Sequence, residues 1–190
     1  MSAPTTSADF DRAYRIPITL WGDVRIPEEV KALAPQGGSR TALELGCGVG
    51  RFSRYLAHQG LRVTGVDFSQ VAISKAWKSV APGELNPQFV VGDVTRLEVL
   101  RGPFDVSLDV GCFHCLDPKG QAAYVSEVSR LLKPGGTHLI WALDSTPSDL
   151  TLSPATMYEI FGPAFELQKS RTSRRRLARS HWYWLVRSLA

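Results

Sequence analysis

Short apolar runs alternate with stretches of helical periodicity along most of the chain. We predict five strands from these runs, at residues 41–45, 61–66, 88–91, 104–110 and 137–143. Helical spacing is clearest where Ile73, Ala76, Trp77 and Val80 recur on one face, which should lie on the sheet. Strands that alternate with helices in this way indicate an α/β fold with a doubly wound, largely parallel sheet.

The ends of the helices agree with this division. Ser69 and Asp117 are predicted N-caps, because their short polar side chains can accept from the first free backbone amides. Gly60 should end one helix, and the Pro-Gly-Gly sequence at 134–136 should end another before the fifth strand. A further short helix is expected over 27–33.

The last part of the chain is strongly basic. It predicts a helix near 156–160 and a closing hairpin of strands near 165–169 and 181–186, joined by an arginine-rich loop. The charge after Glu166 is +7 and that of the rest is −3, because 7 of the 22 basic and none of the 18 acidic residues follow it. A solvated surface is the favoured interpretation, and contact with RNA phosphates is the alternative. The basic residues are Lys169, Arg171, Arg174, Arg175, Arg176, Arg179 and Arg187.

Composition limits the class of protein. With 190 residues, of which 44% are hydrophobic and 21% charged, the chain is long enough for one domain with a substantial core. Three cysteines and the lack of a signal-peptide pattern favour a reducing, cytoplasmic compartment. The longest uncharged apolar stretch, 137–143, is far shorter than the ~20 residues that span a membrane, so we expect no membrane association.

A glycine-rich turn follows the first strand. Ligands of open α/β sheets bind beyond the carboxyl ends of the strands, and here Glu44 precedes Gly46, Gly48 and Gly50. A dinucleotide fingerprint requires G-x-G-x-x-G, but Arg51 stands where its third glycine would be. Glu44 would also repel a pyrophosphate, whereas it suits a nucleoside that carries a cationic group.

Two further acids end the next strands. Asp67 can accept from both hydroxyl groups of a ribose, and the neighbouring Phe68 can pack on an adenine face. Asp93 can accept from an adenine amine while the Val94 amide donates to a ring nitrogen. The joint placement of three acids at three successive strand ends favours a nucleoside site.

These motifs together resemble the class I S-adenosylmethionine (SAM) dependent methyltransferases. The resemblance covers residues 40–145, through the sequences at 43–50, 66–69, 92–94, 104–106 and 131–136. It implies a Rossmann-like sheet of seven strands, the last one antiparallel, with helices on both faces. By this resemblance the cofactor is SAM and the product is S-adenosylhomocysteine. The implied cofactor-binding residues are Glu44, Gly46, Cys47, Gly48 and Gly50 for the methionine part, Asp67 and Phe68, then Gly92, Asp93 and Val94 for adenine, with Asp109 and Val110 near the amino group.

The expected reaction is an in-line displacement in which an acceptor atom attacks the methyl carbon of the sulfonium. His114, after the fourth strand, is the candidate base or acceptor-positioning residue. We divide the chain into an N-terminal lid, 1–38, and a methyltransferase domain, 39–190. Tyr14 and Trp21 of the lid, with Phe113 and His114, are the predicted acceptor contacts; covering a sheet edge or a dimer surface is the alternative role for the lid.

A small molecule is the expected acceptor, methylated on S, O or N. The Asp/Asn-Pro-Pro-Tyr segment of related amino-group methylators is missing, since the chain reads Asp-Val-Gly-Cys at 109–112. A weaker resemblance links the chain to small bacterial methyltransferases of the thiopurine and thiol group. The alternatives are an RNA-binding protein or RNA methyltransferase that uses the arginine-rich loop, and a SAM-binding protein without methyl transfer. Cys112 and Cys115 are interpreted as structural thiols, and no metal is expected.

Overall fold

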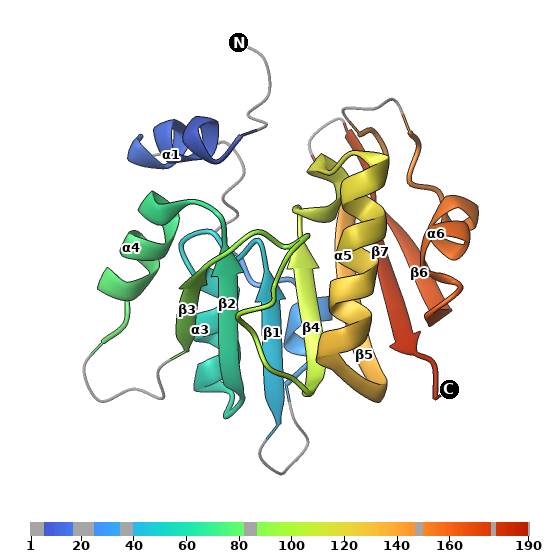
Figure 1. Ribbon diagram of the computed structural model, residues 1–190, viewed down its shortest axis with the longest axis horizontal. Helices are drawn as coiled ribbons and strands as arrows, with labels where there is room; N and C mark the ends of the chain where they lie inside the picture. Colours follow the sequence, from blue (N-terminus) through green and yellow to red (C-terminus); the bar gives the residue numbers. More distant parts are fainter. Residues whose placement is uncertain are drawn as a thin grey trace.

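The computed structural model describes residues 6–16, 25–34, 40–81, 87–146, 150–175 and 178–189. In these residues seven strands form one sheet in the order β3-β2-β1-β4-β5-β7-β6 (Figure 1). β7 runs antiparallel to both of its neighbours, β5 and β6, and the other neighbouring strands are parallel. The predicted fold class, a seven-stranded α/β sheet whose last strand is antiparallel, is confirmed.

The elements have the following bounds. The strands are β1 (Thr41–Leu45), β2 (Arg62–Asp67), β3 (Gln88–Val91), β4 (Phe104–Val110), β5 (Leu132–Leu143), β6 (Phe165–Arg175) and β7 (Ala178–Arg187). The helices are α1 (Ser7–Arg15), α2 (Glu28–Lys31), α3 (Arg51–His58), α4 (Gln70–Lys78), α5 (Pro118–Leu131) and α6 (Pro154–Phe161), with a 3-10 turn η1 (Phe113–Cys115).

Helices cover both faces of the sheet, and each face has its own apolar core. On one face α5 and α6 pack through Tyr124, Val128 and Phe161 against inward side chains of the strands. On the other face α2 and α3 contribute Val30 and Leu56, which meet other strand residues. Burial on both faces explains why the strands read as short, nearly continuous apolar runs.

Two segments differ from the prediction. β5 begins at Leu132, directly after α5, because the Pro-Gly-Gly segment forms an irregularity in the strand where its pairing with β4 shifts. The predicted arginine-rich loop is wrong as well, since β6 and β7 extend into it: Arg174 pairs with Arg179 across the two strands. Trp77 also departs from its predicted place, being 42% exposed, with its ring edge against Phe89.

Helix α1 was not predicted, although its start carries a recognisable signal. The Thr6 hydroxyl accepts from the Asp9 amide, and the Asp9 carboxylate accepts from the Thr6 amide. This reciprocal capping box satisfies two amides at the helix start. α1 lies across the carboxyl ends of the strands beside α4 (Figure 1).

Candidate active site

The carboxylates of Glu44 and Asp67 are buried at the ends of the neighbouring strands β1 and β2. Glu44 accepts from the hydroxyl group of Ser53, on α3. Asp67 accepts from the Gly48 amide at 2.8 Å and from the Ser69 amide at 2.9 Å. The parallel pairing of β1 and β2 thus brings two predicted site residues to one edge of the sheet.

Burial raises the pKa of both carboxyl groups. The pKa of Glu44 rises to about 8, and that of Asp67 also lies above its ordinary value. Removal from water penalises the charged form, and the hydrogen bonds only partly offset this effect. Both groups would therefore gain from a ligand that brings positive charge or hydroxyl donors.

The three glycines of the turn at 46–50 leave no space for side chains at their positions. Gly46, Gly48 and Gly50 all have positive φ values, of 67°, 54° and 73°. A Cβ atom on Gly50 would lie 2.3 Å from the Phe89 ring, and one on Gly46 would lie 2.5 Å from Cβ of Cys112. The backbone of the turn is therefore close-packed against Phe89 and Cys112, a conformation and packing that glycine alone allows at these positions.

The third strand ends in a different environment. Asp93 is exposed, and one of its carboxylate oxygens accepts from the amide and the hydroxyl group of Thr95 at 2.9 and 2.7 Å. Val94 is buried, and Gly92 donates its amide to the carbonyl of Asp67. The predicted adenine contacts thus adjoin the predicted ribose contact.

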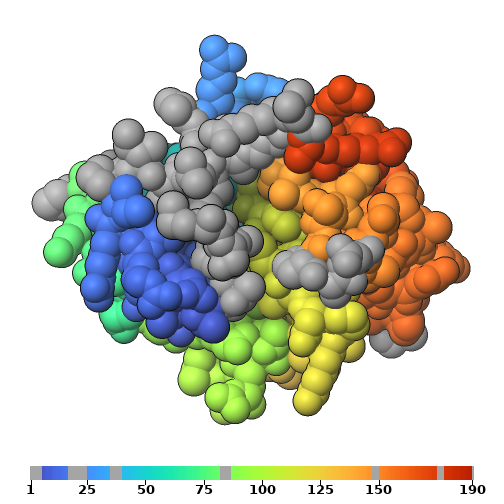
Figure 2. Space-filling view, turned by 90° about the horizontal axis from the view of Figure 1, so that it is seen from above, coloured from blue at the N-terminus to red at the C-terminus, as the bar shows by residue number. Residues whose placement is uncertain are grey.

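Helix α1 covers this part of the edge. Tyr14 is buried, and its hydroxyl oxygen would lie 2.7 Å from a Cβ on Gly48. Asp11 accepts from the Ser69 hydroxyl at 2.5 Å and from the Val71 amide at 3.2 Å, which ties α1 to the start of α4. Phe10 packs on Phe68, with ring centroids 5.1 Å apart. The view from above shows α1 over one side of the edge and residues of β5 and α6 at the other (Figure 2).

Two predicted acceptor contacts do not stand as proposed. Tyr14 lies against the glycine turn, which is the predicted cofactor side rather than the acceptor side. Phe113 is fully buried and packs on Tyr124 and Phe161, so its ring belongs to the core and we no longer propose it as an acceptor contact. Trp21 lies outside the described residues.

The loop after β4 is anchored by Asp109. Its buried carboxylate accepts from the amides of Cys112 and Phe113 at 2.8 and 3.0 Å and from the hydroxyl group of Tyr124 at 2.8 Å. Burial raises the pKa of Asp109 to about 6. The neighbouring Val110 ends β4 and is half-buried. The prediction placed Asp109 here for backbone contacts, and its structural role in holding the loop was not foreseen.

His114 stands on the same loop, half-buried. Its ring lies edge-on to Trp141 of β5, with centroids 6.1 Å apart, and both rings border Gly111. His114 thus lies past the end of β4 and beside Trp141 of β5, and its role toward an acceptor stays a prediction.

The three cysteines are unpaired thiols in the structure. Burial raises the pKa values of Cys47 and Cys112 well above the ordinary value, so neither is an activated thiolate, whereas Cys115 is exposed. Within the described ranges, no three His, Cys, Asp or Glu side chains gather as they would around a metal ion. Nor does any helix in those ranges have the length and apolar character needed to cross a membrane.

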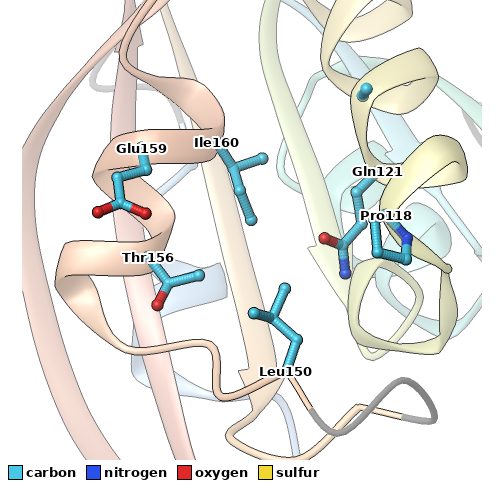
Figure 3. A pocket seen from close by; sticks show the side chains of 7 residues that line it. Pro118, Gln121, Leu150, Thr156, Glu159 and Ile160 are labelled. Atoms are coloured by element: carbon cyan, nitrogen blue, oxygen red, sulfur yellow. The ribbon is translucent and has the colours of Figure 1, made fainter.

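A separate pocket of about 260 Å³ lies between α5 and α6 (Figure 3). The side chains that line it belong to Pro118, Gln121, Ala122, Leu150, Thr156, Glu159 and Ile160. None of these is a predicted site residue.

Comparison with known proteins identifies the family. A family model described as a methyltransferase domain matches residues 42–136. A Schizosaccharomyces pombe protein named as an uncharacterised methyltransferase is 34% identical over 104 residues, which span 55% of this chain and 72% of the relative. The chain belongs to the methyltransferase domain family, and it is a SAM-dependent methyltransferase of class I.

Solved structures share the fold over nearly the whole chain. The N-methyltransferase NodS from Bradyrhizobium japonicum, solved with S-adenosylhomocysteine, gives a TM-score of 0.78 at 18% identity and covers 97% of this chain and 99% of NodS. A protein solved in work on the conversion of a disulfide bond into a thioacetal group during echinomycin biosynthesis gives 0.75 at 23% identity, covering 97% and 94%. At these identities the likeness concerns the fold alone.

Proposed function

We propose that this methyltransferase acts on the S, O or N atom of a small molecule and holds SAM at the ends of β1, β2 and β3. The observation that carries the cofactor placement is the pair of buried carboxylates, Glu44 and Asp67, beside a turn whose three glycines admit no side chain. Glu44 fits a cationic amino group, because such a partner would offset the burial that raises its pKa. Asp67 fits a pair of ribose hydroxyls, because two amides already hold its carboxylate in place.

Helix α1 acts in this proposal as a cover, whereas α2, which also belongs to the predicted lid, 1–38, packs in the core through Val30. Tyr14 closes the space above Gly48, and the Asp11 bonds fix α1 on α4. Such a cover excludes water from the cofactor side and strengthens each electrostatic contact beneath it.

SAM, when bound, supplies a methyl group on a positively charged sulfur. The chain's contribution is to hold an acceptor in line, which can account for much of the rate. His114 would position that acceptor, or take its proton where the attacking atom loses one. Trp141 would provide an apolar wall beside it, since its ring borders the same glycine as His114.

The arrangement of the basic tail favours a small molecule over RNA. Arg171 forms an ion pair with the buried Glu29 of α2, and Arg179 lies 3.5 Å from Asp144 at the end of β5. These arginines complete the fold, which leaves less uncompensated charge for phosphates than the sequence alone indicated.

The test is calorimetric titration with S-adenosylhomocysteine of the wild type, of Asp67→Ala and of Asp105→Asn. Asp105 is a matched control, since it is also a carboxylate on a strand but bonds to Thr41 and Lys133 away from the site. Loss of the Asp67 carboxylate should weaken binding about 10- to 100-fold, the effect of a charged hydrogen bond, while the control stays within about twofold. Equal affinities in the wild type and Asp67→Ala would refute the proposed cofactor site. Labelled SAM with thiols, phenols, amines and total RNA then identifies the acceptor class.

A further inference from the structure

A chain of buried polar side chains crosses the core beneath the loop after β4. The Ser107 hydroxyl group lies 2.7 Å from Nδ1 of His138, and Nε2 of His138 lies 3.2 Å from the Tyr124 hydroxyl group. That hydroxyl group in turn lies 2.8 Å from the Asp109 carboxylate. All four residues are fully buried, on β4, β5 and α5. None of them takes part directly in the proposed transfer.

The hydrogen bonds can run in one direction only when Asp109 is ionised. Its carboxylate accepts from two amides, so the third bond requires Tyr124 to donate its proton to Asp109. The Tyr124 oxygen then accepts from Nε2 of His138, whose Nδ1 accepts from Ser107. This order requires a neutral His138, in agreement with burial that lowers its pKa to about 3.

Polar groups of this kind are costly in an apolar core unless every one has a partner. The surrounding cluster includes Leu45, Ile140 and Phe161, and apolar side chains would fill the same space without desolvation cost. What the polar chain adds is an acceptor for two loop amides, those of Cys112 and Phe113. The hydrogen-bond chain therefore serves to hold the loop after β4 in place, since apolar side chains could fill the core without it.

That loop touches both halves of the site. Cys112 leaves no space for a Cβ on Gly46, in the glycine turn, while His114 lies beside Trp141. Gly111, at a φ of 97°, donates its amide to the carbonyl of Trp141 at 3.0 Å. A shift of this loop would move the wall of the cofactor cradle and the candidate acceptor group together.

We propose that Tyr124 and His138 are positioning residues, which act through Asp109 to fix the 111–115 loop between the cofactor and the acceptor. The placement of both ligands rests on the proposed function, whereas the hydrogen-bond chain that holds the loop does not.

The experiment compares Tyr124→Phe with Tyr183→Phe. Both tyrosines are fully buried on the same face of the sheet, but the Tyr183 hydroxyl group donates to the carbonyl of Leu152, outside the chain of bonds. The readouts are amide hydrogen exchange at Cys112 and Phe113 and the affinity for S-adenosylhomocysteine. We expect exchange at these amides to rise about 10- to 100-fold in Tyr124→Phe, with affinity weakened several-fold, and neither change in Tyr183→Phe.

A second pair of variants separates positioning from general destabilisation. His138→Gln keeps a donor near the place of Nε2, whereas His138→Leu removes it, so the glutamine variant should recover part of the protection at Cys112 and Phe113. Equal exchange in the two His138 variants, or faster exchange across all of β1 and β4 instead of the loop, would overturn the proposal. Wild-type protein that binds no S-adenosylhomocysteine would refute the proposed function, and amide exchange would still report on the loop.

Discussion

The buried carboxylates on the two halves of the carboxyl edge differ in the number of hydrogen-bond donors that the protein gives them. On the cofactor side, Glu44 relies on Ser53 and Asp67 on two backbone amides. On the acceptor side, Asp109 receives two amides and a hydroxyl group that is itself bonded to His138. Burial raises the pKa of Glu44 to about 8 but that of Asp109 only to about 6.

The number of internal donors indicates whether a buried carboxylate is available to bind a ligand or serves to hold the chain in place. A carboxylate with few internal donors is destabilising by itself and is stabilised by a ligand, whereas one with a full set of donors holds the chain in place. The comparison therefore supports the proposal that Glu44 binds the ligand, whereas Asp109 holds the loop after β4, although both are acids at strand ends.

We expect the largest effect, a loss of stability, from a substitution in the glycine turn at 46–50. Gly50→Ala would place a Cβ 2.3 Å from the Phe89 ring at a φ of 73°, and we expect a loss of about 3–5 kcal/mol in the free energy of unfolding. Gly60→Ala is the control, because its φ is 90° but nothing lies within 4 Å of the new atom, so about 1 kcal/mol should be lost. Urea unfolding measures both, and similar losses would show that close packing of the cradle is unimportant.

The next effect is the pH dependence of ligand affinity that Glu44 should cause. Glu44 faces Ser53, Asp67 and Arg51, and its pKa near 8 leaves it mostly protonated in the free protein at pH 6. A cationic ligand binds the ionised form, so affinity for S-adenosylhomocysteine should rise with pH between 6 and 7.5, approaching about tenfold per pH unit. The ligand's own amino group stays largely protonated over this range, so the slope reports the ionisation of Glu44.

The variant Glu44→Gln should lose that slope and bind about 10- to 100-fold more weakly at pH 7.5. Stability without ligand should change in the opposite sense. The folded-state pKa lies above the ordinary value of 4.5, so ionisation of Glu44 lowers the stability of the wild type as the pH rises from 4.5 to 8. Glu44→Gln should lose less stability over this range, and the remaining loss comes from Asp67 and Asp109, whose pKa values are also raised. A wild-type affinity independent of pH would contradict the assignment of Glu44 to binding.

The smallest effect concerns the basic residues of β6. Arg171→Gln leaves the Glu29 carboxylate buried without its ion-pair partner, and we expect a loss of about 1 kcal/mol, limited by the half-exposed arginine. Arg174→Gln, at an exposed position on the same strand, should change stability by less than about 0.5 kcal/mol. Thermal unfolding compares the two, and equal values would mean that Arg171 is as free for an external partner as Arg174.

The sequence was sufficient to place the candidate site residues that lie at the ends of predicted strands. Glu44 and Asp67 lie at the carboxyl ends of two strands that apolar runs predict, so the parallel topology places them at one edge. The capping box of α1 was also present in the sequence, as Thr6 and Asp9, but no apolar run followed to draw attention to it.

The framework of the acceptor side was not predictable in the same way. Ser107, Tyr124 and His138 lie on three different elements, and no local spacing relates them. His138 also stands within an apolar run, where a single polar residue reads as part of a strand. Only the pairing of β4 with β5, which sets Ser107 beside His138, reveals the connection.

The contact between Gly46 and Cys112 limits how this protein can be re-engineered. Because a Cβ at 46 would lie 2.5 Å from Cβ of Cys112, the cofactor cradle and the loop after β4 share one wall. Grafting a loop from another methyltransferase to change acceptor preference would therefore also alter the fit of the donor. Under the proposed function the donor and acceptor specificities would not be independent, and library designs should vary residues 46 and 112 jointly or leave both fixed.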